Sequence, residues 1–218
     1  MFDFAVIWDL DGTIANTQKF HSQVESEILL KHGIIVSPEE ITEKFSGRKT
    51  IEFLTELFNN HGILNPEDLA QKATEKKWLG MKKLIQNSIQ TMPGALELIH
   101  ILSKNKIPMA VASTSNHDYV NFVLQRLQIL NLFKFTIGGD QVKKSKPDPT
   151  IFLQAAKALN FSPEKIIVIE DGRVGIEAAQ KAEMKCIAVR PYFPQRFHPT
   201  IYVKSLEQIS FKTIKELF

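Results

Sequence analysis

The fold of this chain is decided by the stretch Asp9-Leu10-Asp11-Gly12-Thr13, which directly follows the apolar run Phe4-Ala5-Val6-Ile7-Trp8. The apolar run predicts a short buried strand, and Gly12 allows the chain to turn sharply behind it. Two carboxylates therefore lie at the carboxyl end of a strand, which is where open α/β sheets bind ligands. Such carboxylates suit Mg²⁺, or a nucleophilic role in phosphoryl transfer. The alternative is a plain acidic turn, because Asp-Gly is a common turn pair.

The composition is that of an ordinary globular protein with one large domain, or one domain and an insert. The chain has 218 residues, of which 44% are hydrophobic and 23% are charged, and its net charge is +3. The basic residues are spread out apart from the run Lys143-Lys144-Ser145-Lys146, so we expect no nucleic acid as a partner. No apolar run approaches the roughly 20 residues that a membrane helix needs, so we expect no membrane partner either. The single cysteine, Cys186, excludes an intrachain disulfide and fits a cytoplasmic protein.

Two sequence patterns divide the rest of the chain. Between about residue 17 and about residue 86 the apolar spacing is helical and no strand is expected. Four helices are predicted there: the first ends at His32-Gly33, the second begins after the N-cap Ser37, the third ends near Asn60, and the fourth runs from Pro66 to about Gln86. A helical segment of roughly 70 residues is large enough for a small domain. We therefore expect a helical cap domain at 16–87, inserted into an α/β core domain of residues 1–15 and 88–218.

After Met92-Pro93-Gly94 the pattern alternates between helices and apolar strands. Strands are predicted at 108–112, 135–138, 166–169 and 186–189, and helices at 96–104, 118–127, 149–159 and 174–182. Alternation of this kind indicates an α/β fold with a parallel sheet and right-handed crossovers.

Polar and charged residues stand at several of the expected strand ends. Ser113-Thr114-Ser115-Asn116 follows one strand, Lys146-Pro147-Asp148 precedes the helix at 149–159, and Glu170-Asp171-Gly172 follows another strand. Because the carboxyl ends of parallel strands share one edge of a sheet, we expect these groups to meet the first two aspartates in one crevice. Each motif alone has a simple explanation, as a turn, a helix N-cap or a solvated lysine. Their occurrence together, in this order, favours a functional site.

These four motifs resemble those of the haloacid dehalogenase superfamily, in the branch that carries a helical cap after the first strand. The resemblance covers nearly the whole chain and extends to β-phosphoglucomutase and to sugar-phosphate and phosphoglycolate phosphatases. It implies a Rossmann-like parallel sheet core with an inserted all-helical cap domain. It also implies a Mg²⁺-dependent phosphatase that hydrolyses a small phosphorylated metabolite, such as a sugar phosphate, through an aspartyl-phosphate intermediate. Two alternatives stay open: a β-phosphoglucomutase-type phosphohexomutase, and a non-catalytic binding or regulatory module on the same scaffold.

The resemblance also implies catalytic roles for particular residues. Asp9 matches the nucleophile that becomes an aspartyl-phosphate, and Asp11 matches the general acid/base. Ser113 matches the hydroxyl that hydrogen-bonds the transferring phosphoryl group, assisted by the backbone N–H of Thr114. Lys146 matches the lysine that neutralises the phosphate and orients the nucleophile.

A set of Mg²⁺ ligands follows from the same resemblance. Asp9 and Asp171 match the metal-binding acids, and the backbone carbonyl of Asp11 matches a further ligand. Glu170 matches a neighbouring acid that contacts the metal directly or through water. Asn116, at the end of the second motif, is expected to bind substrate.

Further substrate contacts are expected from the cap. His21 would contact the substrate or assist a proton shuttle, with a partly exposed helix residue as the alternative. Gly47 and Arg48 lie in a segment that resembles the cap loop entering the site; Arg48 would grip a phosphate or carboxylate, or else form a surface salt bridge. Lys77 stands where the mutase has a cap lysine, and a solvated helix face is its alternative.

The sequence departs from the resembled pattern in three places, and the first of them bears on the choice between phosphatase and mutase. Thr50 stands where the mutase has an arginine that grips the second phosphate, which favours the phosphatase. Asn16-Thr17-Gln18 is neutral where many relatives carry acidic residues, and Gly172 stands where many have serine.

We expect the protein to be a monomer whose partner is a small phosphorylated metabolite.

Overall fold

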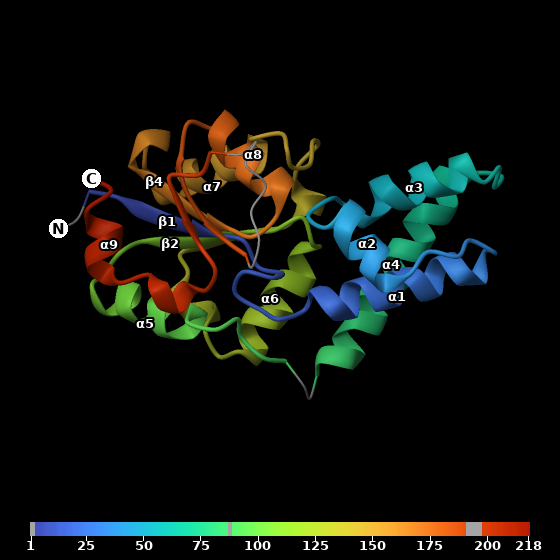
Figure 1. The fold of residues 1–218 in the computed structure, drawn as a ribbon, viewed down its shortest axis with the longest axis horizontal. Helices are drawn as coiled ribbons and strands as arrows, with labels where there is room; N and C mark the ends of the chain where they lie inside the picture. Colours follow the sequence, from blue (N-terminus) through green and yellow to red (C-terminus); the bar gives the residue numbers. More distant parts are fainter. Residues whose placement is uncertain (1–2, 87–88, 191–197) are drawn as a thin grey trace.

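The computed structural model describes residues 3–86, 89–190 and 198–218, and its centre is a parallel sheet (Figure 1). The strands are β1 (Ala5–Trp8), β2 (Met109–Ala112), β3 (Phe135–Ile137), β4 (Ile166–Glu170), β5 (Lys185–Val189) and β6 (Ile201–Val203). They form one six-stranded sheet in the order β3-β2-β1-β4-β5-β6, and all neighbouring pairs are parallel. Because β1 lies between β2 and β4, the residues that follow it emerge at the middle of the sheet edge.

Helices cover both faces of this sheet. They are α5 (Ala95–Lys104), α6 (His117–Arg126), α7 (Thr150–Leu159), α8 (Arg173–Lys181) and α9 (Phe211–Lys215), with short 3-10 turns at Leu130–Leu132, Gly139–Gln141, Pro163–Lys165 and Leu206–Gln208. In β1, Val6 and Trp8 pack into the hydrophobic cluster of α5, α6 and α9, whereas Ala5 and Ile7 pack into the cluster of α7 and α8. Since side chains alternate along a strand, one continuous apolar run serves both faces.

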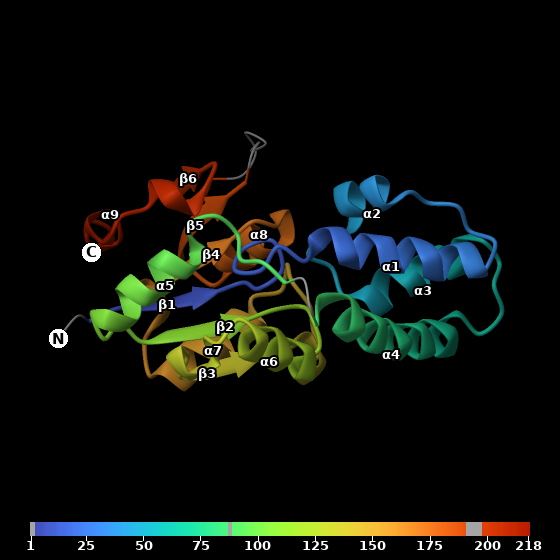
Figure 2. The same cartoon turned by 90° about the horizontal axis from the view of Figure 1, so that it is seen from below.

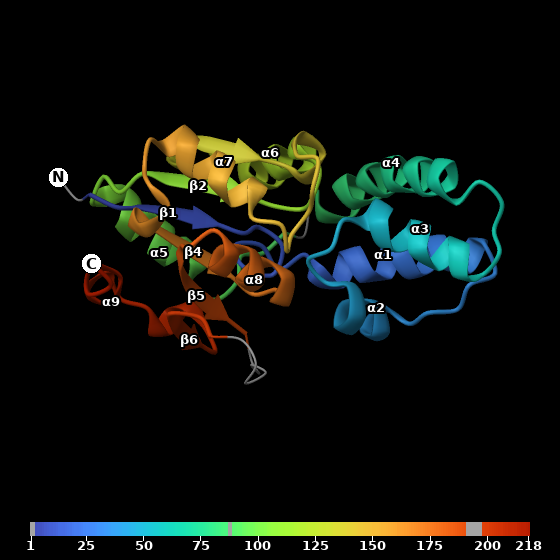
Figure 3. The same ribbon diagram turned by 90° about the horizontal axis from the view of Figure 1, so that it is seen from above.

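The remaining helices form a separate body, which we call the cap. They are α1 (Gln18–Lys31), α2 (Pro38–Phe45), α3 (Thr50–Asn60) and α4 (Pro66–Ile85). The cap has its own hydrophobic cluster, in which Leu29, Phe53, Leu54 and Phe58 are almost fully buried. Figures 2 and 3 show that the cap lies beyond the carboxyl ends of the strands. The cap therefore covers the edge at which the sequence predicts a site.

The chain enters and leaves the cap through two segments that run side by side. The backbone N–H of Asn16 donates to the carbonyl of Gln90 (2.9 Å), and that of Met92 donates to the carbonyl of Ile14 (2.8 Å). The predicted domain limit between 87 and 88 falls outside the described residues. The limit between 15 and 16 lies within the paired segments, and the division into two domains stays a prediction.

The predicted fold class, a parallel α/β sheet with an inserted helical cap, is confirmed. The four predicted cap helices are present within a few residues of their expected limits, and the Ser37 side chain accepts the backbone N–H of Glu40 as an N-cap. No pattern in the sequence predicted β6 or α9. β6 is three residues long and partly exposed at the sheet edge, and so short an edge strand carries no periodic pattern. None of the helices that the structure describes combines the length and apolarity needed to cross a bilayer.

Candidate active site

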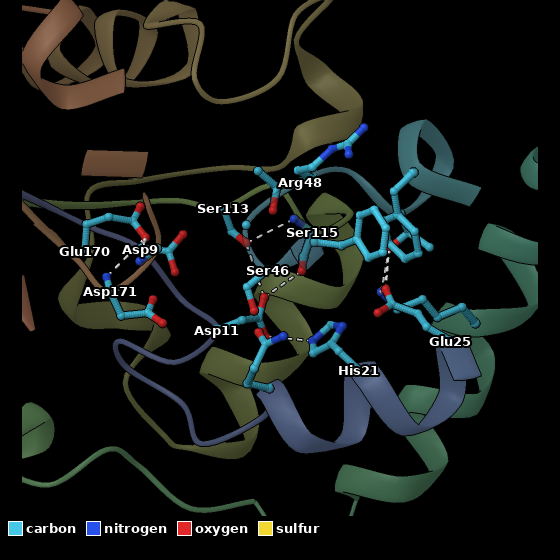
Figure 4. A pocket seen from close by; sticks show the side chains of 18 of the residues that line it. Asp9, Asp11, His21, Glu25, Ser46, Arg48, Ser113, Ser115, Glu170 and Asp171 are labelled. Atoms are coloured by element: carbon cyan, nitrogen blue, oxygen red, sulfur yellow. Dashed lines mark hydrogen bonds and ion pairs between the residues drawn. The ribbon is translucent and has the colours of Figure 1, made fainter. Parts of the chain in front are cut away.

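The loop after β1 sends two carboxylates in different directions. Asp9 turns towards the end of β4, and Asp11 turns towards α1 in the cap (Figure 4). Gly12 makes this possible because its φ of +91° is strained for other residues, and a Cβ there would lie 2.5 Å from Oδ2 of Asp171. Gly12 therefore both forms the predicted turn and leaves room for the carboxylate of Asp171.

A buried lysine holds the nucleophile candidate in place. Nζ of Lys146 donates to Oδ1 of Asp9 (2.6 Å), to Oε2 of Glu170 (2.8 Å) and to the carbonyl of Ala112 (3.1 Å). Lys146 is only 3% exposed, so the alternative of a solvated lysine is wrong. Burial lowers the pKa of Lys146, but the charges of Asp9 and Glu170 outweigh burial and raise it above its usual value. The lysine is therefore a permanent cation between two carboxylates.

Three carboxylates converge beside this lysine. Oxygen atoms of Asp9, Glu170 and Asp171 lie within 4.8 Å of one another. Burial and the charge of Glu170 raise the pKa of Asp171 to about 7, and the same two causes raise the pKa of Asp9. A cation would relieve this repulsion, and hard carboxylate oxygens are the donors that Mg²⁺ prefers. The donor set therefore fits the predicted metal. Asp11 keeps its carboxylate outside the cluster, and its predicted backbone ligand stays a prediction.

Metal binding should depend on pH because protons compete for the same oxygens. A group with a pKa of about 7, as in Asp171, is protonated below that pH, so we expect the Mg²⁺ concentration for half-maximal activity to rise as pH falls from 8 to 6. The rise should approach about tenfold per pH unit for one displaced proton. Mg²⁺ titrations at fixed pH values test this, with excess chelator as the zero-metal control. A half-maximal concentration that is independent of pH, or full activity in chelator, would contradict it.

Asp11 is held as a charged base by residues of both the cap and the core. Its Oδ1 accepts from Thr17 (2.6 Å) and lies 2.9 Å from Nε2 of His21, and its Oδ2 accepts from Ser115 (2.6 Å). Burial raises the pKa of Asp11, but the charge and hydrogen bond of His21, together with the hydroxyls of Ser115 and Thr17, lower it well below its usual value. The side chain of Asp11 is therefore a charged carboxylate, and the ring of His21 lies within hydrogen-bond distance to exchange a proton with it.

His21 lies at the junction of cap and core. It is 5% exposed, so the alternative of a partly exposed helix residue is wrong. Its Nε2 also lies 3.2 Å from the hydroxyl of Tyr119, and its ring packs edge-on against Tyr119 and Trp78. Tyr119 could not be predicted from the sequence, because it falls at an ordinary apolar position of α6. The hydroxyl cluster at 113–115 likewise gives no sign that Ser115 is the residue that bonds Asp11.

The second motif lines the site between these acids. Ser113 is buried, and its Oγ accepts the backbone N–H of Ser115 (3.0 Å) and lies 3.4 Å from Oδ2 of Asp11. Thr114 also lines the cavity. Asn116 caps α6 by accepting the backbone N–H of Asp118 (2.9 Å), and it lines a neighbouring hollow rather than this one. Its predicted role in binding substrate has no support from this placement and stays a prediction.

The cap loop 46–50 closes over the core. A Cβ at Gly47 would lie 2.7 Å from Val174, and Nζ of Lys49 donates to the carbonyl of Val142 (2.9 Å). The cavity between cap and core has a volume of only about 40 Å³. We therefore expect the cap to move outward when a substrate larger than a few water molecules enters.

Two predicted cap contacts line this cavity as members of ion pairs. Arg48 donates from Nη2 to Glu56 (2.7 Å), which is the surface salt bridge named as its alternative. Lys77 is 2% exposed and donates to Glu25 and Thr50, so the alternative of a solvated helix face is wrong. Glu25 itself was missed, because one acidic residue in a helix gives no sign of facing a buried lysine.

One further residue shapes the site through its lack of a side chain. Gly175 lies in α8, where a Cβ would be 1.9 Å from Oε2 of Glu170. The carboxylate that pairs with Lys146 occupies this space. The sequence offered no signal for this close approach.

Comparison with known proteins places this site in a family. The chain belongs to the haloacid dehalogenase-like hydrolases, because the family model matches residues 6–189. A validoxylamine A 7'-phosphate phosphatase of Streptomyces hygroscopicus subsp. limoneus is 30% identical over 186 residues, which are 84% of this chain and 84% of that protein. A phosphorylated carbohydrates phosphatase of Thermotoga maritima is 28% identical over 186 residues, 84% of this chain and 83% of that protein.

The fold of the whole chain is also similar to that of solved structures. A β-phosphoglucomutase from Clostridium difficile has a TM-score of 0.87 and 29% sequence identity, over 100% of this chain and 97% of that chain. These similarities confirm the family resemblance drawn from the four motifs.

Proposed function

We propose that the chain is a Mg²⁺-dependent phosphatase that hydrolyses a small phosphorylated metabolite, a sugar phosphate or similar compound, through an aspartyl-phosphate on Asp9. The class of enzyme, a hydrolase of phosphate monoesters, is confirmed by the family and by the named phosphatases similar to the chain. One observation carries the proposal: Lys146 fixes Asp9 beside Glu170 and Asp171, while Asp11 lies separately against His21. The two aspartates thus have environments suited to two different roles.

In the first step, a carboxylate oxygen of Asp9 attacks the phosphorus atom and forms the aspartyl-phosphate. Lys146 keeps the carboxylate oriented, and the hydroxyl of Ser113 with the backbone N–H of Thr114 stabilises the charge on the phosphoryl oxygens. Asp9, Asp171 and Glu170 would hold Mg²⁺, which when bound neutralises negative charge shared by nucleophile and phosphate. Asp11 passes a proton to the departing oxygen after receiving it from His21, whose Nε2 lies 2.9 Å from Oδ1 of Asp11.

In the second step, water attacks the aspartyl-phosphate. Asp11, held as the charged base by its hydrogen bonds, removes a proton from this water. Phosphate then leaves and Asp9 is regenerated. The same residue acts as acid and then as base, which requires the reversible proton exchange that the contact with His21 allows.

The cavity favours hydrolysis over the phosphohexomutase alternative. A mutase must hold a second phosphate, which requires an available cation. Among the described cap residues that line the cavity, Arg48 and Lys77 carry positive charge, and each is paired with a glutamate. Thr50 is neutral where the mutase resemblance has arginine. If the protein were a non-catalytic binding module, the buried ion pair of Lys146 with Asp9 would have no function.

The decisive experiment combines an activity assay with a trapped intermediate. An aryl phosphate should be hydrolysed with Mg²⁺ and not with chelator. Asp11→Asn should lower turnover by roughly 10²–10⁴-fold, and one phosphoryl group should accumulate on the protein because water lacks its base. Intact-protein mass spectrometry detects that group. Asp68→Asn, an exposed position on α4, is the control and should behave as wild type.

Two outcomes would overturn the proposal. A wild-type protein inactive on all phosphate esters in Mg²⁺ would favour the non-catalytic alternative. Normal turnover of Asp11→Asn on a substrate with a poor leaving group would remove Asp11 from its role. A cytoplasmic location and a monomeric state also stay predictions, and light scattering during gel filtration tests the second.

A further inference from the structure

A buried charged cluster faces the cavity from the cap side. Oε1 of Glu25 in α1 accepts from Nζ of Lys77 in α4 (2.5 Å) and from Oγ1 of Thr50 in α3 (2.9 Å), and Lys77 also donates to Thr50 (2.6 Å). All three residues line the cavity and are at most 6% exposed. We call Glu25, Thr50 and Lys77 the cap triad. In Figure 4, Glu25 lies across the cavity from Asp9 and Asp171.

The cap triad keeps hydrogen-bonding capacity that the protein does not use. Both of the hydrogen bonds that Glu25 accepts from Thr50 and Lys77 end on Oε1, which leaves Oε2 as an acceptor for a ligand. Lys77 has three N–H donors and uses two of them, on Glu25 and Thr50. The triad therefore offers a carboxylate acceptor and an ammonium donor side by side. Two neighbouring hydroxyl groups match this pair, because one can donate while the other accepts.

The charge of the triad decides against an anionic ligand. Glu25 and Lys77 form a buried ion pair, so their charges cancel. The pair therefore offers no net positive charge to attract a second phosphate or a carboxylate, and either anion would be repelled where it approaches Oε2 of Glu25. A hydroxyl group carries no such penalty.

We propose that the cap triad is a polyol subsite, which selects phosphate monoesters whose far end carries neighbouring hydroxyl groups and disfavours those whose far end is anionic. This inference rests on the proposed function, since it assigns the leaving group of the same reaction. The substrate class is then a neutral polyol or sugar monophosphate. Glu25 is the residue that sets the preference, because it supplies the acceptor and cancels the lysine charge.

Two probes of equal length test the subsite. Sorbitol 6-phosphate and 6-phosphogluconate differ only at the far carbon, which is a hydroxymethyl group in one and a carboxylate in the other. We expect wild type to prefer the sorbitol ester by roughly 10–100-fold in kcat/KM, the range for one hydrogen bond to a charged group. An aryl phosphate without hydroxyls serves as the third probe, since it reports on the phosphoryl site alone.

Glu25→Gln keeps the side-chain size and removes the charge. The preference for the sorbitol ester should fall to about one or below, because Lys77 then presents an unpaired cation to the carboxylate. Hydrolysis of the aryl phosphate should fall less than hydrolysis of the sorbitol ester, and the loss should lie mainly in KM. Glu27→Gln, an exposed glutamate on the same helix, is the matched control and should keep the wild-type ratio.

A second variant covers the case in which an unpaired lysine unfolds the cap. Glu25→Gln/Lys77→Met removes both charges and should give a ratio near one without gaining 6-phosphogluconate activity. Thermal unfolding of each variant checks the fold. Equal losses on all three probes would show that the triad only holds the helices together, and an unchanged ratio would overturn the subsite.

The failure of the subsite can be told from the failure of the proposed function. Hydrolysis of the aryl phosphate with no preference between the two hexose-derived probes, or with neither of them hydrolysed, overturns the subsite alone. Hydrolysis of none of the three probes in Mg²⁺ overturns both.

Discussion

Replacing Asp9 with asparagine should abolish phosphate-ester hydrolysis while leaving the fold intact. The amide has the shape of the carboxylate but cannot act as the nucleophile, so no aspartyl-phosphate forms. We expect turnover to fall by roughly 10⁴–10⁶-fold, as for the loss of other enzyme nucleophiles. The amide oxygen can still accept the hydrogen bond of Lys146, and repulsion from Glu170, one cause of the raised pKa of Asp9, disappears. The free energy of unfolding should therefore change by no more than about 2 kcal/mol.

The measurement pairs steady-state rates with thermal unfolding of the same samples. Asp3→Asn is the matched control, because Asp3 precedes the same strand and is exposed. It should retain wild-type turnover. An Asp9→Asn protein with more than a few per cent of wild-type activity, or one that carries phosphate after incubation with substrate, would remove Asp9 from the role of nucleophile.

Replacing Lys146 with methionine should damage both activity and stability. Methionine fills a similar volume, but it leaves Asp9 and Glu170 buried without their shared cation. Removing one partner from a buried ion pair destabilises by about 3–5 kcal/mol. Turnover should fall by roughly 10²–10³-fold, because a fixed positive charge near the phosphoryl group is lost.

The stability deficit of this variant should depend on pH in a definite direction. Burial and the charge of Glu170 hold the folded-state pKa of Asp9 above its usual value, and loss of the lysine removes the charge that lowers it, so the folded protein binds more protons than the unfolded chain. Stability then rises as pH falls, and the deficit should be smaller at pH 5 than at pH 8. Chemical denaturation at both pH values, in chelator, measures this.

Lys144→Met is the matched control for Lys146→Met. Lys144 lies two residues earlier in the same loop, and its side chain is 76% exposed. Its replacement should change neither turnover nor the free energy of unfolding by a measurable amount. A deficit in Lys146→Met that is the same at both pH values would show that the lysine stabilises by packing rather than by charge.

The local elements of this protein could be predicted from the sequence because local interactions specify them. The apolar run before Asp9 forms β1, and Ser37 caps its helix through a hydrogen bond over three residues. The helical period of residues 17–86 predicted the cap, and the alternation of helices and strands after Gly94 predicted the α/β core. Parallel strand ends must share one edge, so the meeting of Asp9, Lys146 and Asp171 at that edge followed from the order of the elements alone.

The pairing of side chains was decided only by the tertiary structure. Asp9 and Asp11 are equivalent as neighbours in the sequence, yet one faces Lys146, 137 positions away, and the other faces His21. The difference arises from the turn at Gly12 and from the packing of the cap against the core. It gives the two carboxylates opposite pKa shifts, which no local pattern contains.

The cap shows most clearly the difference between what the sequence predicts and what tertiary packing decides. That α1 and α4 are helices follows from their apolar spacing, but the burial of Lys77 against Glu25, 52 positions away, does not. A charged residue on a helix is normally solvated, so only the crossing of α1, α3 and α4 reveals that these charges face the cavity. The sequence determined that acidic and polar residues meet at one edge of a parallel sheet with a helical insert, because strand order and periodicity suffice for that. Tertiary packing decided which side chains meet the substrate, because burial and long-range contact select among chemically equal candidates.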